Sequence, residues 1–278
     1  MKDSDIKFSR QYQVYDSHLD QWRDDSVAVE EPLQISLKYD DKEFVLSITM
    51  RTPGDDRQLI IGFLFSESII KSLEEIINIT PSVDHQGLMN SNEWLIELTG
   101  NVPAWILNLS RHQMTHSSCG VCGKTSIQSL ELKSPPSINR DNPIISQTLL
   151  STLNSKINNY QLGFSETGGM HACALFEISK EILSIKEDVG RHNALDKLVG
   201  FHLENGQLPA NDHILWLSGR ISYEMVQKAI MAGVAIIVAV GAPTHLAVET
   251  ARRFGITLIG FNRNDRFNIY NGHWRLTN

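Results

Sequence analysis

The stretch HILWLSGRISYEMVQKAIMAGVAIIVAVGAPTHLAVETARRFGITLIGF, residues 213–261, decides the fold of this chain. It contains three short apolar segments, at 213–217, 235–240 and 257–261, that alternate with longer segments of helical character. Strands and helices in this order form a largely parallel sheet that is covered on both faces. Residues 236–240 are apolar at every position, as a doubly covered strand should be. The stretch therefore predicts a three-layer αβα domain.

The same alternation extends over most of the second half of the chain, after Pro135 and Pro136. Here we expect helices over 146–158, 193–204, 223–232 and 246–254, and a pair of strands over 172–178 and 182–187. The first half has a different pattern. It predicts a hairpin over 33–50, a buried helix over 59–70, and strands over 76–79 and 93–98.

These patterns predict an α/β chain, α+β overall, with three parts. Residues 1–111 form an N-terminal arm and a small α+β unit, and the polar, acidic residues 1–30 are expected to be a loosely held arm. Residues 112–135, which lack a sustained period, are expected to be a mobile loop that carries a CxxC motif. Residues 136–278 form the αβα domain.

Composition and charge exclude several classes of protein. The chain has 278 residues, 41% hydrophobic and 21% charged, and is long enough to bury a core without disulfide staples. Its net charge of -7 disfavours nucleic acid and anionic membranes as partners. Neither a secretory signal nor an apolar run of membrane-spanning length is present. We therefore expect a cytoplasmic protein.

Three cysteines are too few, and odd in number, for a disulfide framework in a chain of this size. Two of them, Cys119 and Cys122, lie in the glycine-containing segment SSCGVCGK. The neighbouring His116 and Lys124 favour the thiolate form, which is the nucleophile in sulfur chemistry. The segment indicates an exposed, reactive dithiol. Cys173, flanked by alanines in an expected strand, is interpreted as a small buried hydrophobe.

The spacing of Cys119 and Cys122 leaves other roles open. They could form half of a structural zinc site completed by His112 and His116, although a second CxxC is missing from the sequence. They could form a thioredoxin-type redox pair. That motif lies between a strand and a helix, however, whereas Cys119 lies in a long segment without a sustained period. They could also be bystander thiols. Deaminase-type zinc chemistry is not expected, because the segment 170–173 lacks the glutamate of the H-x-E element.

Three expected loops follow strands and precede helices, at 188–192, 218–222 and 241–244. In sheets of this kind, ligands bind beyond the carboxyl ends of the strands, where helix N-termini offer unpaired N–H donors. Two of the loops place an arginine beside a glycine: Gly190 with Arg191, and Gly219 with Arg220. Guanidinium groups and backbone donors suit phosphate oxygens. Neither a Walker A motif nor a dinucleotide fingerprint is present, so several loops must build the pocket.

Three motifs in order make the chain recognisable: CGVCG at 119–123, EDVGRHNALDK at 187–197 and GRISYEMVQK at 219–228. With further matches such as TPGD at 52–55 and GFLFSE at 62–67, the chain resembles the formate dehydrogenase accessory sulfurtransferase family, FdhD. The resemblance covers nearly all of the chain after about residue 28.

This resemblance implies a cytoplasmic sulfurtransferase that takes persulfide sulfur from a cysteine desulfurase. The sulfur is passed to the molybdenum cofactor, bis(molybdopterin guanine dinucleotide), which formate dehydrogenase requires. The cofactor is thus a bound substrate, which a guanine nucleotide can mimic. The resemblance also implies a homodimer with a cytidine-deaminase-like αβα domain. An alternative is a non-catalytic cofactor-binding chaperone whose CxxC is a structural or redox clip.

The resemblance also assigns residues to roles. Cys119 carries the persulfide, and Cys122 is its partner. The cofactor-binding segment falls on Phe261, Asn262, Arg263, Asn264, Asp265 and Arg266. Relatives commonly have a glycine and adjacent arginines where this chain has Asn264-Asp265-Arg266, so Asp265 can contribute only its backbone N–H. We expect Asp188 and His192 to organise their loop rather than to perform chemistry.

Overall fold

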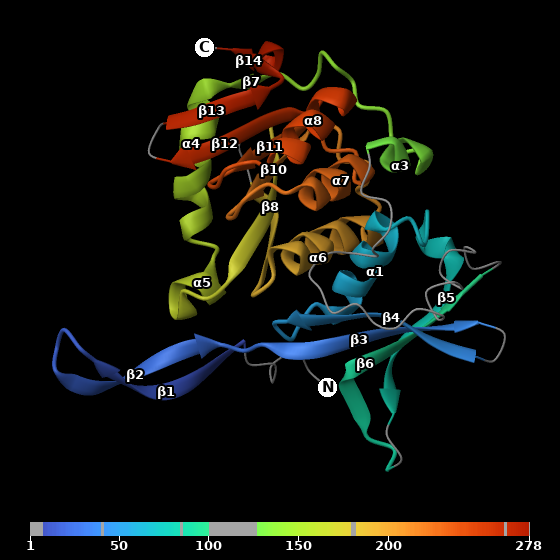
Figure 1. Ribbon diagram of the computed structural model, residues 1–278, viewed down its shortest axis with the longest axis vertical. Helices are drawn as coiled ribbons and strands as arrows, with labels where there is room; N and C mark the ends of the chain where they lie inside the picture. Colours follow the sequence, from blue (N-terminus) through green and yellow to red (C-terminus); the bar gives the residue numbers. More distant parts are fainter. Residues whose placement is uncertain are drawn as a thin grey trace.

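The computed structural model of the chain describes residues 8–39, 42–83, 86–99, 127–178, 182–263 and 266–277. It shows a mixed α/β protein, which confirms the predicted fold class. A large sheet with helices on both faces occupies the second half of the chain, and a smaller sheet with one helix occupies the first half (Figure 1).

The large sheet has six strands in the order β13-β12-β11-β10-β8-β9. In chain order they are β8 (His171–Glu177), β9 (Ile182–Asp188), β10 (His213–Leu217), β11 (Ile236–Ala239), β12 (Thr257–Arg263) and β13 (Arg266–Asn271). Within it, β10, β11 and β12 pair in parallel, whereas β8 and β13 run antiparallel to their neighbours. The prediction of a largely parallel sheet is therefore right only for the centre. At both edges, short connections add antiparallel strands where no helical crossover intervenes.

Helices cover both faces of this sheet, as predicted. On one face lie α6 (Arg191–Glu204), α7 (Tyr223–Met231) and α8 (His245–Phe254), and on the other lies α4 (Gln147–Asn158). Alternate side chains of each strand point to opposite faces of the sheet and pack into the core on that face. Leu215 and Ile237 pack with the first group of helices, whereas Trp216 and Val238 pack with α4. This alternation explains why the central strands are apolar throughout.

Local signals fix the ends of two of these helices. Ser146 caps α4, because its hydroxyl accepts the N–H of Leu149 at 3.2 Å. Thr244 caps α8 in the same way through the N–H of Ala247. Gly255 ends α8 in the left-handed conformation, with φ of 70°, which costs a glycine little.

The first half forms a four-stranded sheet in the order β4-β3-β6-β5. Its strands are β3 (Glu31–Tyr39), β4 (Lys42–Arg51), β5 (Ile76–Val83) and β6 (Met89–Leu98), and its helix is α1 (Asp56–Ser66). The expected hairpin, buried helix and strands are therefore confirmed, within a few residues at their ends. Leu33, Ile35 and Leu37 of β3 pack against Leu59, Ile60 and Leu64 of α1 in one core.

The two halves meet where α1 crosses α6 at a pair of glycines. A Cβ atom at Gly62 would overlap the backbone carbonyl of Asp196, and one at Gly200 would overlap that of Gln58. Only glycine therefore permits this close approach of the two helix backbones. The crossing holds the small sheet against the helical face of the large one (Figure 1).

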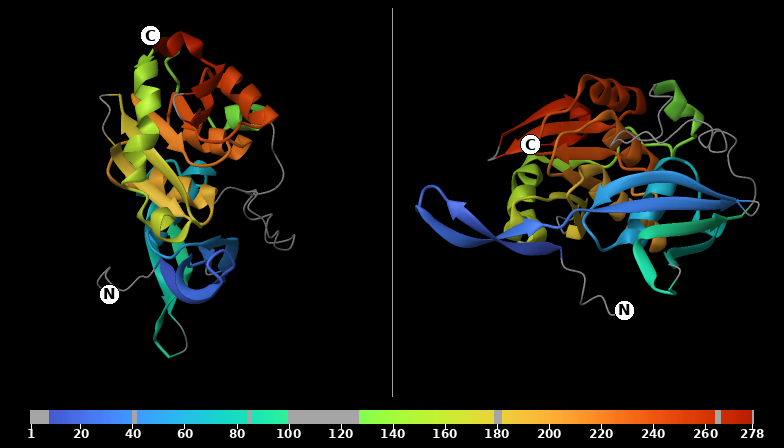
Figure 2. Two further views of the ribbon diagram at one scale, coloured as in Figure 1. Left: turned by 90° about the vertical axis from the view of Figure 1, so that its left-hand side faces the viewer. Right: turned by 60° about the horizontal axis from the view of Figure 1, so that its bottom comes forward.

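The N-terminal arm is more ordered than predicted. It is a hairpin of β1 (Ser9–Asp16) and β2 (Gln21–Ala28), paired without interruption along its length. Arg23 of β2 reinforces it by bonding Asp16 of β1 at 3.0 Å across the strands and Asp25 of its own strand at 2.9 Å. The hairpin projects from the body, and its base contacts α5 (Leu162–Thr167) (Figure 2).

A helix also lies within the expected loop at 112–135. This is α3 (Ile127–Leu132), whose Leu130 is fully buried in the core on the side of α6 and α7. Residues 112–126 lie outside the described part of the chain. The remaining elements are two short strands, β7 (Ile145–Ser146) and β14 (Leu276–Thr277), and the 3-10 turns η2 (Leu73–Glu75) and η3 (His273–Arg275).

Candidate functional site

The carboxyl ends of β9, β10, β11 and β12 lie at the same edge of the large sheet, because these strands run in one direction. The three predicted loops therefore come together, as expected. Two of them are bonded to each other: the N–H of Gly241 donates to Gly219 O at 3.2 Å, and that of Ile221 donates to Ala242 O at 3.0 Å. The structure thus forms one composite edge from three loops that are spread over residues 188–244.

Close backbone packing at this edge depends on Gly241. A Cβ atom there would lie 2.7 Å from Gly219 O and 2.8 Å from the backbone nitrogen of Arg220. Those distances are shorter than van der Waals contact, so a larger residue would push the two loops apart. The glycines therefore set how closely the arginine-bearing loop approaches its neighbour.

The loop after β9 is organised by the fully buried Asp188. Its carboxylate is 2.7 Å from Lys197 Nζ and accepts the N–H groups of Thr52 at 3.1 Å and Gly190 at 2.8 Å. Lys197 Nζ also donates to Thr52 O at 2.8 Å. These contacts join the turn before α1 to the N-terminus of α6. The geometry agrees with the expectation that Asp188 organises its loop.

The N-termini of α6 and α7 both lie at this edge. The N-cap of α6 is Gly190, which has no side chain, and the hydroxyl of Ser222, the N-cap of α7, accepts no N–H from its own helix. Free N–H groups at a helix N-terminus, together with the helix dipole, favour a bound anion. At α7, the carboxylate of Glu224 already accepts hydrogen bonds from Ser222 and from its own backbone N–H, so the N-terminus of α6 is the one that suits a phosphate.

Arg191 lies between these loops. Its Cδ is 3.7 Å from the position that a Cβ on Gly219 would take. Its Nε is buried and has no hydrogen-bond partner within the described residues. A buried guanidinium donor without an acceptor is costly, and an anionic oxygen from a ligand would satisfy it.

Arg220 completes the arginine pair of the two loops. Its side chain is exposed at the start of the segment that leads into α7. It makes no ion pair with any residue that the structure describes. Arg191 and Arg220 therefore present one shielded and one open guanidinium group at the same edge.

Two histidines that line this edge are held in the neutral form. Burial, together with the nearby Arg191, lowers the pKa of His171. Burial, followed by the charges of Arg191 and Lys228, lowers the pKa of His192 to about 4. Each ring is therefore uncharged, and each can donate one N–H to a ligand.

Hydrogen bonds to serines orient these rings. Ser218 Oγ accepts the N–H of Ala172 at 2.9 Å and lies 3.2 Å from His171 Nδ1, so its own proton is free to point at that nitrogen. His171 then carries its proton on Nε2. Ser222 Oγ lies 3.4 Å from His192 Nε2.

Sequence reasoning missed His171 as part of the edge. His171 begins β8, which runs antiparallel to β10, so its amino end reaches the edge where the other strands finish. A prediction that assumes parallel strands looks for site residues only at the carboxyl ends of the strands, whereas His171 lies at the amino end of β8. Ser218 and Ser222, by contrast, belong to the loop that the sequence predicted at 218–222.

The described residues of the predicted cofactor-binding segment, 261–263 and 266, differ in their exposure. Phe261 is 44% exposed and adopts a φ of 53°. Asn262, expected to meet the cofactor, is fully buried, and its amide donates to Leu150 O at 3.0 Å. Its side chain therefore fixes the loop against α4.

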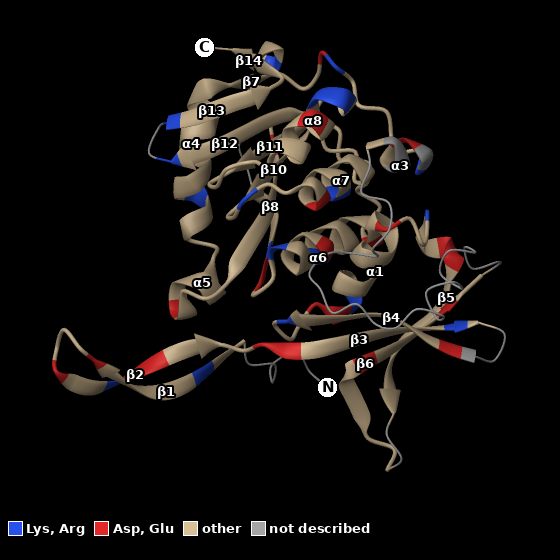
Figure 3. Cartoon of the chain, viewed as in Figure 1, with Lys and Arg blue, Asp and Glu red and all other residues tan. Residues whose placement is uncertain are grey.

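The two arginines of this segment remain available. Arg263 and Arg266 are exposed, and Arg263 Nε donates to Val240 O at 3.1 Å. Basic residues flank the short connection between β12 and β13 (Figure 3). Asn264 and Asp265 lie outside the described residues, so the expectation for Asp265 stays a prediction.

Cys119 and Cys122, with His112 and His116, also lie outside the described residues. Cys173 is 1% exposed, and burial raises the pKa of its thiol far above the ordinary value. This confirms its interpretation as a buried hydrophobe. Among the described residues, no three histidine, cysteine, aspartate or glutamate side chains group as metal ligands.

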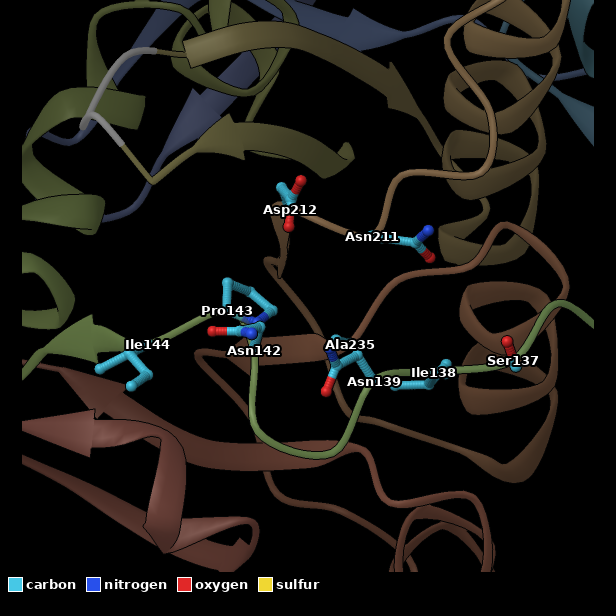
Figure 4. A pocket seen from close by; sticks show the side chains of 9 residues that line it. All are labelled: Ser137, Ile138, Asn139, Asn142, Pro143, Ile144, Asn211, Asp212 and Ala235. Carbon is cyan, nitrogen blue, oxygen red and sulfur yellow. The ribbon is translucent and has the colours of Figure 1, made fainter.

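A polar cavity of about 630 Å³ lies at the other edge of the sheet (Figure 4). Asp212 and Ala235, which precede β10 and β11, line it together with Asn142 and Pro143. It is therefore separated from the arginine-bearing edge by the length of the strands. It holds none of the residues predicted for the site.

Fold and site together define a class: an αβα protein with an edge suited to a phosphate-bearing ligand, preceded in the chain by a CxxC segment. The chain belongs to the FdhD/NarQ family, whose model matches residues 28–277. No helix in the described part of the chain has the length and apolar character needed to cross a bilayer.

Several relatives match nearly the whole chain. A protein named sulfur carrier protein FdhD from Nocardia farcinica is 39% identical over 91% of this chain and 89% of its own length. Proteins of the same name from Streptomyces avermitilis and Sulfurisphaera tokodaii are each 41% identical, over 91% and 89% of this chain and 90% of their own lengths. A crystal structure of a candidate formate dehydrogenase accessory protein from Desulfotalea psychrophila has a TM-score of 0.70 at 25% identity. It covers 98% of this chain and 100% of that protein.

Proposed function

We propose that this protein is a sulfur carrier that accepts persulfide sulfur from a cysteine desulfurase and transfers it to the molybdenum cofactor, bis(molybdopterin guanine dinucleotide), for formate dehydrogenase. One observation carries the proposal. Proteins named sulfur carrier protein FdhD are about 40% identical to this chain over nine tenths of its length. The cofactor is the substrate of the transfer.

The arginine-bearing edge supports the cofactor part of the proposal. A guanine dinucleotide arm carries a pyrophosphate, whose charge must be offset locally in a chain of net charge -7. Arg191 and Arg220, with the N-terminus of α6, supply that local positive potential. Arg263 and Arg266 extend the basic surface for the rest of the ligand.

The CxxC segment supplies the sulfur chemistry in this proposal. The Cys119 thiolate attacks the outer sulfur of the donor persulfide. An S–S bond forms at Cys119, and the donor leaves as a thiolate. Release of that sulfur as sulfide requires two electrons. Attack of the Cys122 thiolate on Cys119 Sγ provides them, leaving a Cys119–Cys122 disulfide that an external dithiol reduces.

The CxxC segment is followed in the chain by α3, which begins at Ile127. Leu130 anchors α3 in the core, and Lys133 Nζ lies 3.6 Å from Glu67 of the first half. The chain that follows the segment is therefore anchored in the core on the side of α6 and α7.

Mass spectrometry tests the proposal directly. Incubation with a cysteine desulfurase and L-cysteine should add the mass of one sulfur atom to the wild-type chain, reversibly by thiol reductant. Cys119→Ala should abolish the addition, whereas Cys173→Ala, which removes a buried thiol, should keep it. An unmodified wild-type chain that binds zinc stoichiometrically would favour the alternative, a non-catalytic cofactor chaperone with a structural CxxC.

A further inference from the structure

The helix α3 is the first described element after the CxxC segment, and it has only six residues. A helix this short is not stable by itself in water, so contacts with the rest of the protein must hold it in place. Leu130 makes one such contact, because its side chain is fully buried in the core on the side of α6 and α7. Glu131 makes a second, an ion pair with Arg253 of α8 at 2.5 Å that lies on the surface.

A third contact joins the end of α3 to the first half of the chain. The Nζ atom of Lys133, directly after α3, lies 3.6 Å from Glu67 Oε2, and the two side chains are only 22% and 15% exposed. Burial lowers the pKa of Lys133, and the nearby charge of Glu67 offsets part of that effect. The charged form of Lys133 therefore depends on this carboxylate, whereas the pair of Glu131 and Arg253 is well solvated.

The Glu67 carboxylate in turn needs more than one cation. Glu67 is the C-cap of α1, where the helix dipole disfavours a negative charge. Lys228 of α7 lies 3.9 Å from Glu67 Oε1, but its Nζ atom bonds both carboxylate oxygens of Asp196 more closely, at 2.7 and 2.9 Å. Two carboxylates therefore share the Lys228 ammonium group. Lys133 brings the second positive charge, which balances this group of side chains.

These four side chains form one cluster, called here the four-charge cluster: Glu67, Lys133, Asp196 and Lys228. The cluster lies below the arginine-bearing edge. Asp196 follows Arg191 by five residues in α6, and Lys228 follows Glu224 by four residues in α7, so each lies about one turn deeper in its helix. The cluster thus joins α3 to the two helices that begin at the edge.

We propose that the four-charge cluster positions α3 relative to the arginine-bearing edge, and that Lys133 is the positioning residue through which it acts. The proposal rests on the proposed function, because α3 matters for chemistry only if the CxxC segment carries sulfur. Cys122 lies five residues before Ile127, and five residues span at most about 18 Å. The place where α3 docks therefore limits where Cys122 can be.

Hydrogen exchange of the full-length protein, measured by mass spectrometry, tests whether Lys133 holds α3. Lys133→Gln should raise exchange over residues 127–132 by about tenfold, because it leaves a largely buried carboxylate short of a counter-charge. Exchange in β10 and β11 should not change. Lys133→Arg keeps the charge and should restore most of the protection. The matched control is Glu131→Gln, which breaks a surface ion pair of the same helix and should raise exchange by less than about fivefold.

Sulfur transfer provides a second readout, which a merely structural role would not divide into two steps. Lys133→Gln should accept sulfur from a cysteine desulfurase as the wild type does, because loading needs only an accessible dithiol. Delivery of that sulfur, measured as activation of formate dehydrogenase, should fall by about tenfold, because delivery requires a fixed position relative to the edge. GDP affinity should stay unchanged, and Lys133→Arg should restore delivery.

Three results would overturn the proposal: unchanged exchange in α3, exchange that rises equally in α3 and β10, and equal effects of Lys133→Gln and Glu131→Gln. Loss of loading and delivery to the same extent would also contradict a positioning role. A wild type that takes up no sulfur would instead contradict the proposed function. The exchange measurements would then still decide whether Lys133 holds α3 in place.

Discussion

Lys197 Nζ lies 2.7 Å from Asp188 Oδ2, and neither side chain is more than 2% exposed. Asp188 ends β9 and Lys197 is the seventh residue of α6, so the pair spans the loop that carries Gly190 and Arg191. Through Thr52 the same pair holds the turn before α1. The edge of the large sheet and the first half of the chain are thus held in place together.

Removal of one partner of this pair should destabilise the whole protein. Asp188→Asn leaves the Lys197 ammonium buried without its counter-charge, which typically costs about 3–5 kcal/mol. Urea denaturation should show this as a lower midpoint. The control is Glu249→Gln, whose partner Arg252 is on the surface. Loss of that exposed pair should cost less than about 1 kcal/mol. Equal effects from both variants would contradict a buried, structural pair.

Gly241→Ala should separate the two bonded loops. The new Cβ would lie 2.7 Å from Gly219 O, so the backbone must shift, at a cost of about 1–3 kcal/mol. If the edge binds a guanine nucleotide, the affinity for GDP measured by calorimetry should fall as well. Gly168→Ala is the matched control, since Gly168 has a φ of 65° but open space around it. It should lose some stability and retain GDP binding.

Arg191→Ala should weaken GDP binding by about tenfold or more, because a charge-assisted hydrogen bond contributes about 1.5–3 kcal/mol. Arg191→Lys should recover little of the loss, because an ammonium group cannot replace the guanidinium fork. Arg252→Ala removes an exposed arginine from α8 and should bind GDP as the wild type does. GDP affinity that depends equally on Arg191 and Arg252 would indicate only nonspecific charge attraction.

Stability should rise with pH between about pH 4 and pH 6.5 in part through His202. Burial lowers the pKa of His202 to about 4, below its ordinary value of 6.5. In this window the unfolded chain binds the proton and the folded chain does not, so acidification favours unfolding. His202→Gln should flatten the dependence, measured as thermal midpoint against pH. His18→Asn, at an exposed site in the arm, should leave the slope unchanged.

The periodicity of the sequence correctly predicted the elements that bury a continuous apolar face. The strand at 213–217 and the helix after Ser146 appear where their patterns placed them, because burial of those side chains is a local requirement. The loops at Gly190 and Gly219 were also located correctly, since strand direction brings them to one edge. The arm at 9–28 was not recognised as a hairpin, because its strands are held by cross-strand polar pairs such as Arg23 with Asp16.

By itself the sequence determined the α/β class, the order of the strands and helices that bury apolar faces, the burial of Cys173, and the motifs that resemble the family. Only the tertiary structure decided that His171 joins the site, that the Asn262 amide is buried against α4, and that Arg191 keeps a donor without a partner among the described residues. The physical reason is that apolar periodicity reflects burial within one element. Hydrogen bonds and charge pairs depend on which elements meet, and that is set by packing such as the crossing of Gly62 and Gly200.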